Sequence, residues 1–136
     1  MLSLAMESVG SAYAPYSGVR VAAVIEDASG GLHRGVNMEN ASYGLSICAE
    51  RAAAAAAVAS GCREFVRALV HSPDVTPVPC GACLQVLAEF CRPEAEILLS
   101  GPSGAVESTT LGSLMPRAFR MPGGIGPQAA EGRCPP

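Results

Sequence analysis

The sequence lacks lysine altogether, and charged residues of either sign are few. Charged side chains make up 15% of the 136 residues, all nine cations are arginine, and the formal net charge is -3. Proteins whose main task is to hold nucleic acid backbones usually carry a basic face. The charge therefore argues against a nucleic acid partner, but it is compatible with a small nucleoside ligand.

Long apolar runs are also missing. No stretch approaches the roughly 20 apolar residues that a membrane-spanning helix needs. The N-terminus does not show the charged segment followed by an apolar segment that marks an export signal. We therefore expect no membrane partner and a cytoplasmic location. In that reducing compartment, the six cysteines favour metal or redox chemistry over disulfides.

The chain does have enough apolar residues to build a core. Hydrophobic residues account for 49% of the sequence, and this length is sufficient for one domain without covalent staples. Residues 1–119 contain all the periodic segments and are predicted to form this single domain. Residues 120–136 are rich in proline and glycine, so we expect them to be a mobile tail.

The periodic segments alternate between helix and strand, which predicts an α/β protein. The first three are a helix over residues 2–13 and an antiparallel pair of strands over 19–25 and 32–37. The others are a helix from Cys48 to Gly61, a strand at 65–71, a helix at 81–90, strands at 95–100 and 105–109, and a short helix at 111–114. The strand, helix and strand within 65–100 predict a parallel pair with a right-handed crossover.

Two of the predicted helices begin with cysteine. Cys48 precedes the alanine run 52–57, a strong helix former, and Gly61 is a natural helix end. Cys80 and Cys83, in the segment Pro79-Cys80-Gly81-Ala82-Cys83, open the second helix. The positive end of a helix dipole favours a thiolate. Two helix N-termini can thus offer three thiolates to one metal ion.

The number of ligands separates two kinds of zinc site. A structural zinc ion normally has four protein ligands, whereas a catalytic one has three and leaves a fourth position for water. His33 lies in a predicted strand and His71 at a strand end, and we interpret both as core or surface residues. Three cysteines therefore favour a catalytic ion, with a non-enzymatic structural zinc protein as an alternative.

Glu50 and Arg51, which follow Cys48 and Ala49, fit a site for a catalytic ion. Glu50 can take a proton from a metal-activated water and pass it to a leaving group; otherwise it only stabilises the first turn of its helix. Three thiolates leave a zinc site with net negative charge, and Arg51 beside the sulfur atoms would offset it from outside the ligand shell. The other interpretation of Arg51 is an ordinary solvated helix residue.

These motifs resemble a known family. Cys48-Ala49-Glu50 with Pro79-Cys80-Gly81-Ala82-Cys83 matches the all-cysteine form of the zinc nucleobase deaminase signature, in which the glutamate is the acid and base. Segments 37–43, 47–51, 80–86 and 114–119 narrow the resemblance to the small homotetrameric zinc-dependent cytidine deaminases, over about residues 2–119. It implies a three-layer α-β-α fold with a mixed five-stranded sheet, one Zn²⁺ per subunit and a homotetramer.

The resemblance also implies an activity and roles for individual residues. The reaction would be hydrolytic deamination of cytidine or 2'-deoxycytidine to the uridine product and ammonia, as in pyrimidine salvage. The implied roles are zinc binding by Cys48, Cys80 and Cys83, proton transfer by Glu50 to the ring N3 and the amino group, binding of the ribose 3'-hydroxyl by Asn37 and Glu39, contact of the Ala49 N–H with the pyrimidine O2, and contributions across subunits from Tyr43 and Phe119.

One position departs from the family pattern. The family usually has an aromatic residue against the base where this chain has Val19, and proline where it has Arg20. Loss of the aromatic contact would weaken base binding by about 1 kcal/mol. A modified cytosine nucleoside or a nucleoside antibiotic is therefore an alternative substrate. Cys62, Cys91 and Cys134 lie outside the expected site and are interpreted as small buried or incidental residues.

Overall fold

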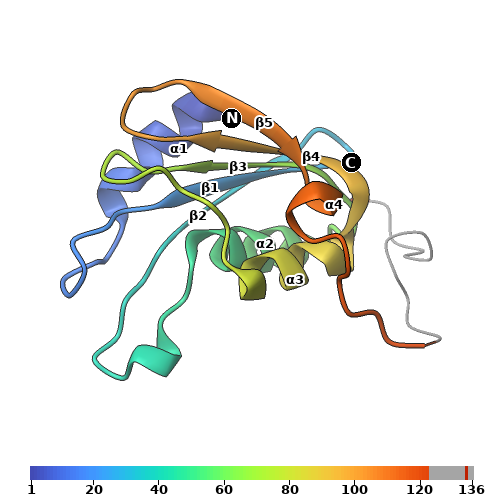
Figure 1. Ribbon diagram of the computed structural model, residues 1–136, viewed down its shortest axis with the longest axis horizontal. Helices are drawn as coiled ribbons and strands as arrows, with labels where there is room; N and C mark the ends of the chain where they lie inside the picture. Colours follow the sequence, from blue (N-terminus) through green and yellow to red (C-terminus); the bar gives the residue numbers. More distant parts are fainter. Residues whose placement is uncertain (123–133, 135–136) are drawn as a thin grey trace.

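The structure is a computed structural model that describes residues 1–122 and 134, with helices on both faces of one sheet (Figure 1). The helices are α1 (Leu2–Ser8), α2 (Ala49–Ala59), α3 (Gly81–Phe90) and α4 (Leu111–Leu114), with 3-10 turns at Val9–Ser11 and Tyr43–Leu45. The strands are β1 (Ala22–Asp27), β2 (Leu32–Val36), β3 (Phe65–His71), β4 (Cys91–Ser100) and β5 (Val106–Thr110). None of the described helices is long and apolar enough to cross a membrane.

The sheet has the strand order β2-β1-β3-β4-β5. Strands β3 and β4 are parallel, with Leu69 opposite Leu98, and α3 lies in the crossover between them. All other neighbouring strands are antiparallel. The predicted mixed five-stranded sheet is confirmed, together with its antiparallel first pair and its parallel pair.

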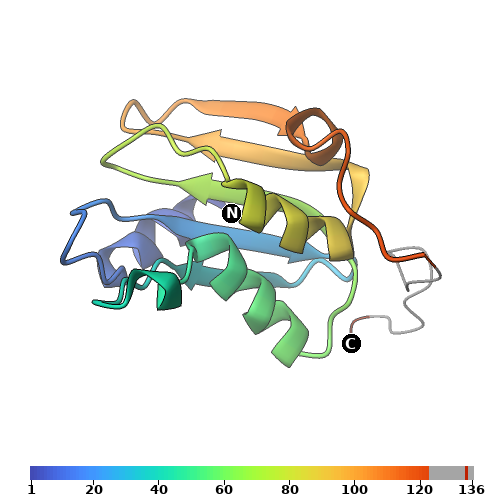
Figure 2. The same ribbon diagram turned by 60° about the horizontal axis from the view of Figure 1, so that its bottom comes forward.

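Three layers result because the central strands are buried on both faces. On one face, Ala5 and Val9 of the N-terminal segment pack against Ala22, Val24 and Leu69. Ala23 and Ile25 of β1 and Ala68 and Val70 of β3 instead pack in the core cluster that contains the buried residues of α2 and α3. Figure 2 shows these two helices side by side on their face of the sheet, with α1 behind it. The predicted α-β-α layering is confirmed.

Helix α2 approaches the sheet closely because small residues line both surfaces. Ala49, Ala53 and Ala57 have no exposed surface. A Cβ atom added to Gly35 of β2 would lie 2.3 Å from the backbone nitrogen of Ala53 and 2.5 Å from the carbonyl oxygen of Ala49. Only glycine therefore permits this approach, which fixes the start of α2 relative to the sheet.

Some element boundaries differ from those expected. Helix α1 ends at Ser8, and the chain continues as a 3-10 turn. Strand β1 begins at Ala22 because the Asn37 side chain takes the place of strand pairing, bonding the carbonyl of Val19 and the N–H of Val21. Strand β4 begins earlier, at Cys91, which pairs with Phe65 before a register shift. Most of the expected mobile tail 120–136 lies outside the described residues.

Candidate active site

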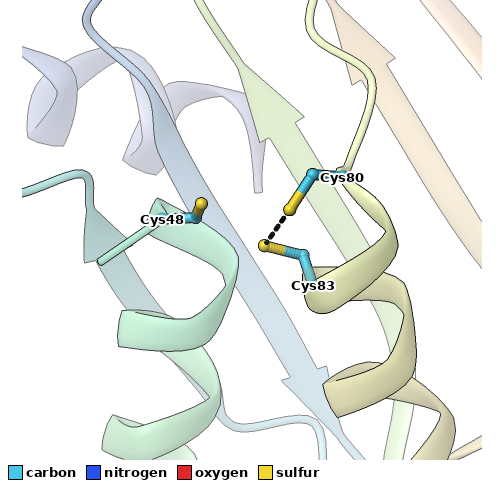
Figure 3. Close-up of side chains that lie close together, drawn as sticks. All are labelled: Cys48, Cys80 and Cys83. Atoms are coloured by element: carbon cyan, nitrogen blue, oxygen red, sulfur yellow. Dashed lines mark hydrogen bonds between the residues drawn. The ribbon is translucent and has the colours of Figure 1, made fainter. Parts of the chain in front are cut away.

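Three sulfur atoms converge between the N-termini of α2 and α3. Cys48 is the N-cap residue of α2, Cys80 is the N-cap residue of α3, and Cys83 lies in the first turn of α3 (Figure 3). Their Sγ atoms all lie within 4.8 Å of one another, and those of Cys80 and Cys83 are 3.5 Å apart. The structure thus brings together the three cysteines that the sequence nominated.

The three thiols can all be ionised together only if a cation neutralises their charge. Burial raises the pKa of Cys48 and Cys83, and the charge of Glu50 raises both further. Burial opposes ionisation of Cys80 as well, but hydrogen bonds from the backbone N–H groups of Cys83 and Ala82 contribute to a lowered pKa there. Three thiolates beside a carboxylate repel one another unless a divalent ion neutralises them. Three sulfur donors with one free position fit Zn²⁺.

Glu50 is a buried carboxyl in the first turn of α2, with 6% of its surface exposed. Burial raises its pKa, although hydrogen bonds with its own N–H and with the Cys83 thiol, and the charge of Arg51, oppose the rise. A carboxyl whose pKa is shifted toward neutrality can both accept and donate a proton. Its position beside Cys83 places this function next to the three sulfur atoms.

Arg51 lies beside the same cluster. Its Nη2 donates to the carbonyl oxygen of Ser46 at 3.0 Å, and its contact with the Cys48 sulfur raises the pKa of the guanidinium. The buried Nε atom has no hydrogen-bond partner among the described residues. A spare donor next to a thiolate would stabilise negative charge on the sulfur.

Two adjoining pockets open from the cluster, and Asn37 and Cys48 line both of them. The larger measures about 460 Å³ and is lined by Tyr16, Ser17, Asn37, Met38, Glu39, Tyr43, Ser46, Ile47 and Cys48. The smaller measures about 300 Å³ and is lined by Val21, Asn37, Cys48, Ala49, Glu50, Val70, Val75, Thr76, Pro77, Val78 and Cys80. The smaller pocket thus contains the acid, and the larger pocket adjoins it.

The chain matches the family model "Cytidine and deoxycytidylate deaminase zinc-binding region" over residues 1–98. The chain belongs to this family. It is 40% identical over 120 residues to a cytidine deaminase of Halalkalibacterium halodurans, covering 88% of this chain and 91% of that one. A cytidine deaminase of Mycobacterium tuberculosis strain H37Rv is 39% identical over 120 residues, 86% and 85% of the two chains.

Solved structures of the same family have the same fold. The crystal structure of a cytidine deaminase from Burkholderia pseudomallei superposes with a TM-score of 0.81 at 40% identity, covering 86% of this chain and 94% of that one. Zinc is part of the family description, and the three sulfur donors of this deaminase-family site suit that ion. The zinc requirement expected from the sequence is therefore confirmed.

Asn37 and Glu39 line the larger pocket and also hold its loops. The Asn37 side-chain amide donates one hydrogen bond to the carbonyl oxygen of Val19 and accepts one from the N–H of Val21. One Glu39 oxygen accepts from the N–H groups of Tyr16 at 2.8 Å and Ser17 at 3.2 Å, and the other accepts from the Ser17 hydroxyl. These hydrogen bonds, that of the Ser17 hydroxyl above all, lower the pKa of Glu39. Both side chains keep capacity for further hydrogen bonds.

The remaining predicted contacts lie at the edge of the site. Tyr43 is 74% exposed, and its ring meets that of Tyr16 edge-on at 5.8 Å. Phe119 is 68% exposed, and its backbone bonds the Gln85 side chain at 2.9 and 3.0 Å. Val19 is not among the residues that line the two pockets in the described chain, whereas Val21 lines the smaller one.

The sequence predicts a loop between β3 and α3 but assigns it no role in the site. Residues 75–78 of that loop form the apolar wall opposite Glu50 in the smaller pocket. Asp74 of the same loop binds Arg20 through two side-chain bonds of 2.7 and 3.0 Å and a backbone bond of 2.9 Å. The nearness of Pro77 and Val78 to Cys80 in the sequence was the available signal. The ion pair has no local signal, because 54 positions separate its partners.

Proposed function

We propose that this protein catalyses the zinc-dependent hydrolytic deamination of cytidine and 2'-deoxycytidine, giving the corresponding uridine and ammonia for pyrimidine salvage. One observation carries the proposal: three sulfur donors and the buried carboxyl of Glu50 lie together where a pocket reaches the start of α2. Three ligands leave a metal position for water, and a carboxyl beside it serves proton transfer. Family membership supports the same reaction.

The chain's own groups bind the base at the start of α2. The N–H of Ala49 belongs to the first residue of the helix, where backbone N–H groups lack partners within the helix. It donates to the pyrimidine O2. The apolar residues Val21, Val70 and Pro77 exclude water from around the ring. The substrate carbons are thereby placed beside Glu50.

Glu50 moves the protons. Cys48, Cys80 and Cys83 would hold the Zn²⁺ ion, which when bound would supply a water molecule activated for attack on C4 at neutral pH. The Glu50 carboxylate accepts the first proton of that water and delivers it to N3. It then carries the remaining proton of the hydroxyl added at C4 to the amino group, so that the C4–N bond breaks and ammonia leaves. The burial that raises the pKa of Glu50 favours this exchange. Arg51 offsets the negative charge of the thiolates.

The sugar occupies the larger pocket. The free donor of Asn37 and the free lone pairs of Glu39 bind the ribose 3'-hydroxyl. Their bonds to residues 16–21 fix both side chains before the substrate arrives. The 3'-hydroxyl is common to the ribo- and deoxyribonucleoside, so both are substrates.

The active enzyme is proposed to be a homotetramer. Tyr43 and Phe119 are large aromatic side chains that expose most of their surface, at 74% and 68%. Exposed aromatic groups of this kind are typical of interfaces, and we assign them to pockets of neighbouring subunits. Size-exclusion chromatography with light scattering tests this assembly, and an active monomer would contradict it.

The enzyme is proposed to work in the cytoplasm, with residues 1–119 as its catalytic domain. The cysteines are all free thiols in the structure, and the three at the site must stay reduced to bind zinc. A reducing compartment supplies that condition. Fractionation of the native cell with detection of the protein tests the location.

An ultraviolet assay of the purified protein tests the activity. Cytidine, 2'-deoxycytidine and base-modified cytosine nucleosides are each incubated with the zinc-loaded protein, and formation of the uridine product is followed. The proposal predicts turnover of the first two. Turnover confined to modified nucleosides would support the alternative suggested by Val19. Bound zinc with no turnover of any cytosine nucleoside would indicate a structural zinc protein.

A further inference from the structure

A second group of metal-binding side chains lies at the other end of α2. Asp27 ends β1, Cys62 follows the C-terminus of α2, and Cys134 is near the end of the chain. The Asp27 carboxylate oxygen and the two sulfur atoms all lie within 4.8 Å of one another. This is the same spacing criterion that the three cysteines of the active site satisfy. The 11 residues of α2 separate the two groups by about 16 Å.

The carboxylate of Asp27 is held in place by the hairpin between β1 and β2. Its Oδ1 accepts from the N–H of Ser29 at 2.8 Å, the hydroxyl of Ser29 at 2.6 Å and the N–H of Gly31 at 3.0 Å. Its Oδ2 faces the cysteines and accepts from the Cys62 thiol at 3.0 Å. One oxygen therefore serves the turn, and the other is directed at the two sulfur atoms.

His33 completes the surroundings of this oxygen. Its Nε2 lies 2.6 Å from Asp27 Oδ2, and the ring comes from the neighbouring strand β2. Ligating carboxylates in metal sites are commonly oriented by such hydrogen bonds. Asp27 is 2% exposed, Cys62 3% and Cys134 8%, so these groups face one another rather than solvent.

We propose that Cys62, Cys134 and Asp27 bind a second Zn²⁺ ion, with His33 as the hydrogen-bond partner that positions the carboxylate. Two thiolates and a carboxylate oxygen are all preferred zinc ligands. Binding displaces the two thiol protons to solvent, and no electron is transferred. The ion connects residue 134 to the β1–β2 hairpin and to the end of α2, so its role is to stabilise the fold.

Metal counting on the full-length protein tests this site. The protein is purified with a phosphine reductant and zinc, excess metal is removed by gel filtration, and zinc per chain is measured by elemental analysis and native mass spectrometry. The expected values are two ions for the wild type and one for Cys134→Ser and for Cys62→Ser, each of which keeps its deaminase activity. Cys91→Ser, which alters a buried thiol of the same core that is not one of the three donors, is the matched control and keeps both ions.

Three outcomes would overturn the proposal. One is a single ion in the wild type and in both variants. Another is two ions in Cys134→Ser, which would place the second ion elsewhere. The third is a disulfide between Cys62 and Cys134. It would be seen as two fewer alkylated thiols when the reductant is omitted, together with the lack of a second ion when the reductant is present. Cobalt substitution gives an independent readout, because thiolate-to-cobalt absorption per chain falls in Cys134→Ser only if that sulfur binds metal.

Discussion

The two ends of helix α2 carry thiols that differ in their position relative to the helix dipole and in their access to pockets. At the start of the helix, Cys48 and the neighbouring Cys80 cap helix N-termini, and both line pockets. Cys62 instead follows the helix C-terminus, where the dipole disfavours an anion. Burial, together with Cys134 and Asp27, raises the pKa of Cys62 to about 12. Similar donor spacing thus occurs beside two pockets at one end of the helix and in a buried setting at the other.

The largest contrast is expected from removing one sulfur at each end. Changes outside the ligand shell of a metal cost about 10- to 100-fold in affinity or activity. Cys83→Ala removes a ligand itself, so we expect kcat/KM for cytidine to fall by more than about 100-fold, with loss of one zinc ion. Cys62→Ala should lose one ion and keep kcat/KM. Equal activity losses in the two variants would contradict the division of roles.

A second test concerns the packing that positions the start of α2. Gly35→Ala forces a Cβ atom against the backbone of Ala49 and Ala53. Such overpacking costs about 1–3 kcal/mol, which urea denaturation measures, and displacement of Cys48 should also lower kcat. The control is Gly10→Ala, whose Cβ atom would meet nothing within 4 Å. Unchanged stability in Gly35→Ala would show that the helix position is not constrained by this contact.

Treatment with a chelator tests whether the two ends of α2 bind zinc with different affinities. Cys48 and Cys80 cap helix N-termini, where the helix dipole favours a thiolate, whereas Cys62 follows the end of α2, where the dipole disfavours one. We therefore expect a chelator to remove the ion at Cys62 and Cys134 before the active-site ion. Activity should stay intact until the active-site ion is lost. Zinc content and turnover are measured on the same samples. If activity falls as soon as the chelator begins to remove zinc, this order is wrong.

The smallest effect is expected from the exposed ion pair at the pocket rim. Asp74→Asn frees the loop that carries the pocket wall, so KM should rise about two- to fivefold with kcat unchanged. The pKa of Asp74 is lowered from 3.8 to about 2, through its bonds to Arg20. Its stabilising effect is therefore present above pH 3.8 and lost as the pH falls toward 2.

The pH dependence gives the ion pair its own measurement. The difference in thermal unfolding midpoint between wild type and Asp74→Asn should be constant near neutrality and should vanish as the medium becomes acidic enough to protonate Asp74. Glu107→Gln, which changes an exposed carboxylate of β5, is the matched control. A midpoint difference that persists at pH 2 would exclude the ion pair as its cause.

Local sequence signals were sufficient for the main elements and for the metal cluster. The alanine run and the two cysteine-led helix starts predicted where Cys48, Cys80 and Cys83 would meet, because helix N-termini have characteristic residues. The α/β class followed from the alternation of strands and helices, whereas the three layers were implied by the family resemblance. These predictions depend on neighbours in the sequence.

Features formed by distant segments were not predictable in this way. The wall of the smaller pocket, the Arg20–Asp74 pair and the meeting of Cys62 with Cys134 depend on how loops approach one another. The start of β1 was placed too early because Asn37, 16 positions away, bonds the N–H of Val21. Cys62 and Cys134 were interpreted as small buried or incidental residues, and both are buried. Nothing in the sequence near either residue indicates that the two lie close together.

The most direct test of the central claim is steady-state turnover of cytidine by Glu50→Gln, measured together with its zinc content. Glutamine keeps the size of the side chain but cannot transfer the proton. The account predicts a fall in kcat of about 10²- to 10⁴-fold with zinc bound as in the wild type. Turnover at the wild-type rate with zinc retained would contradict it.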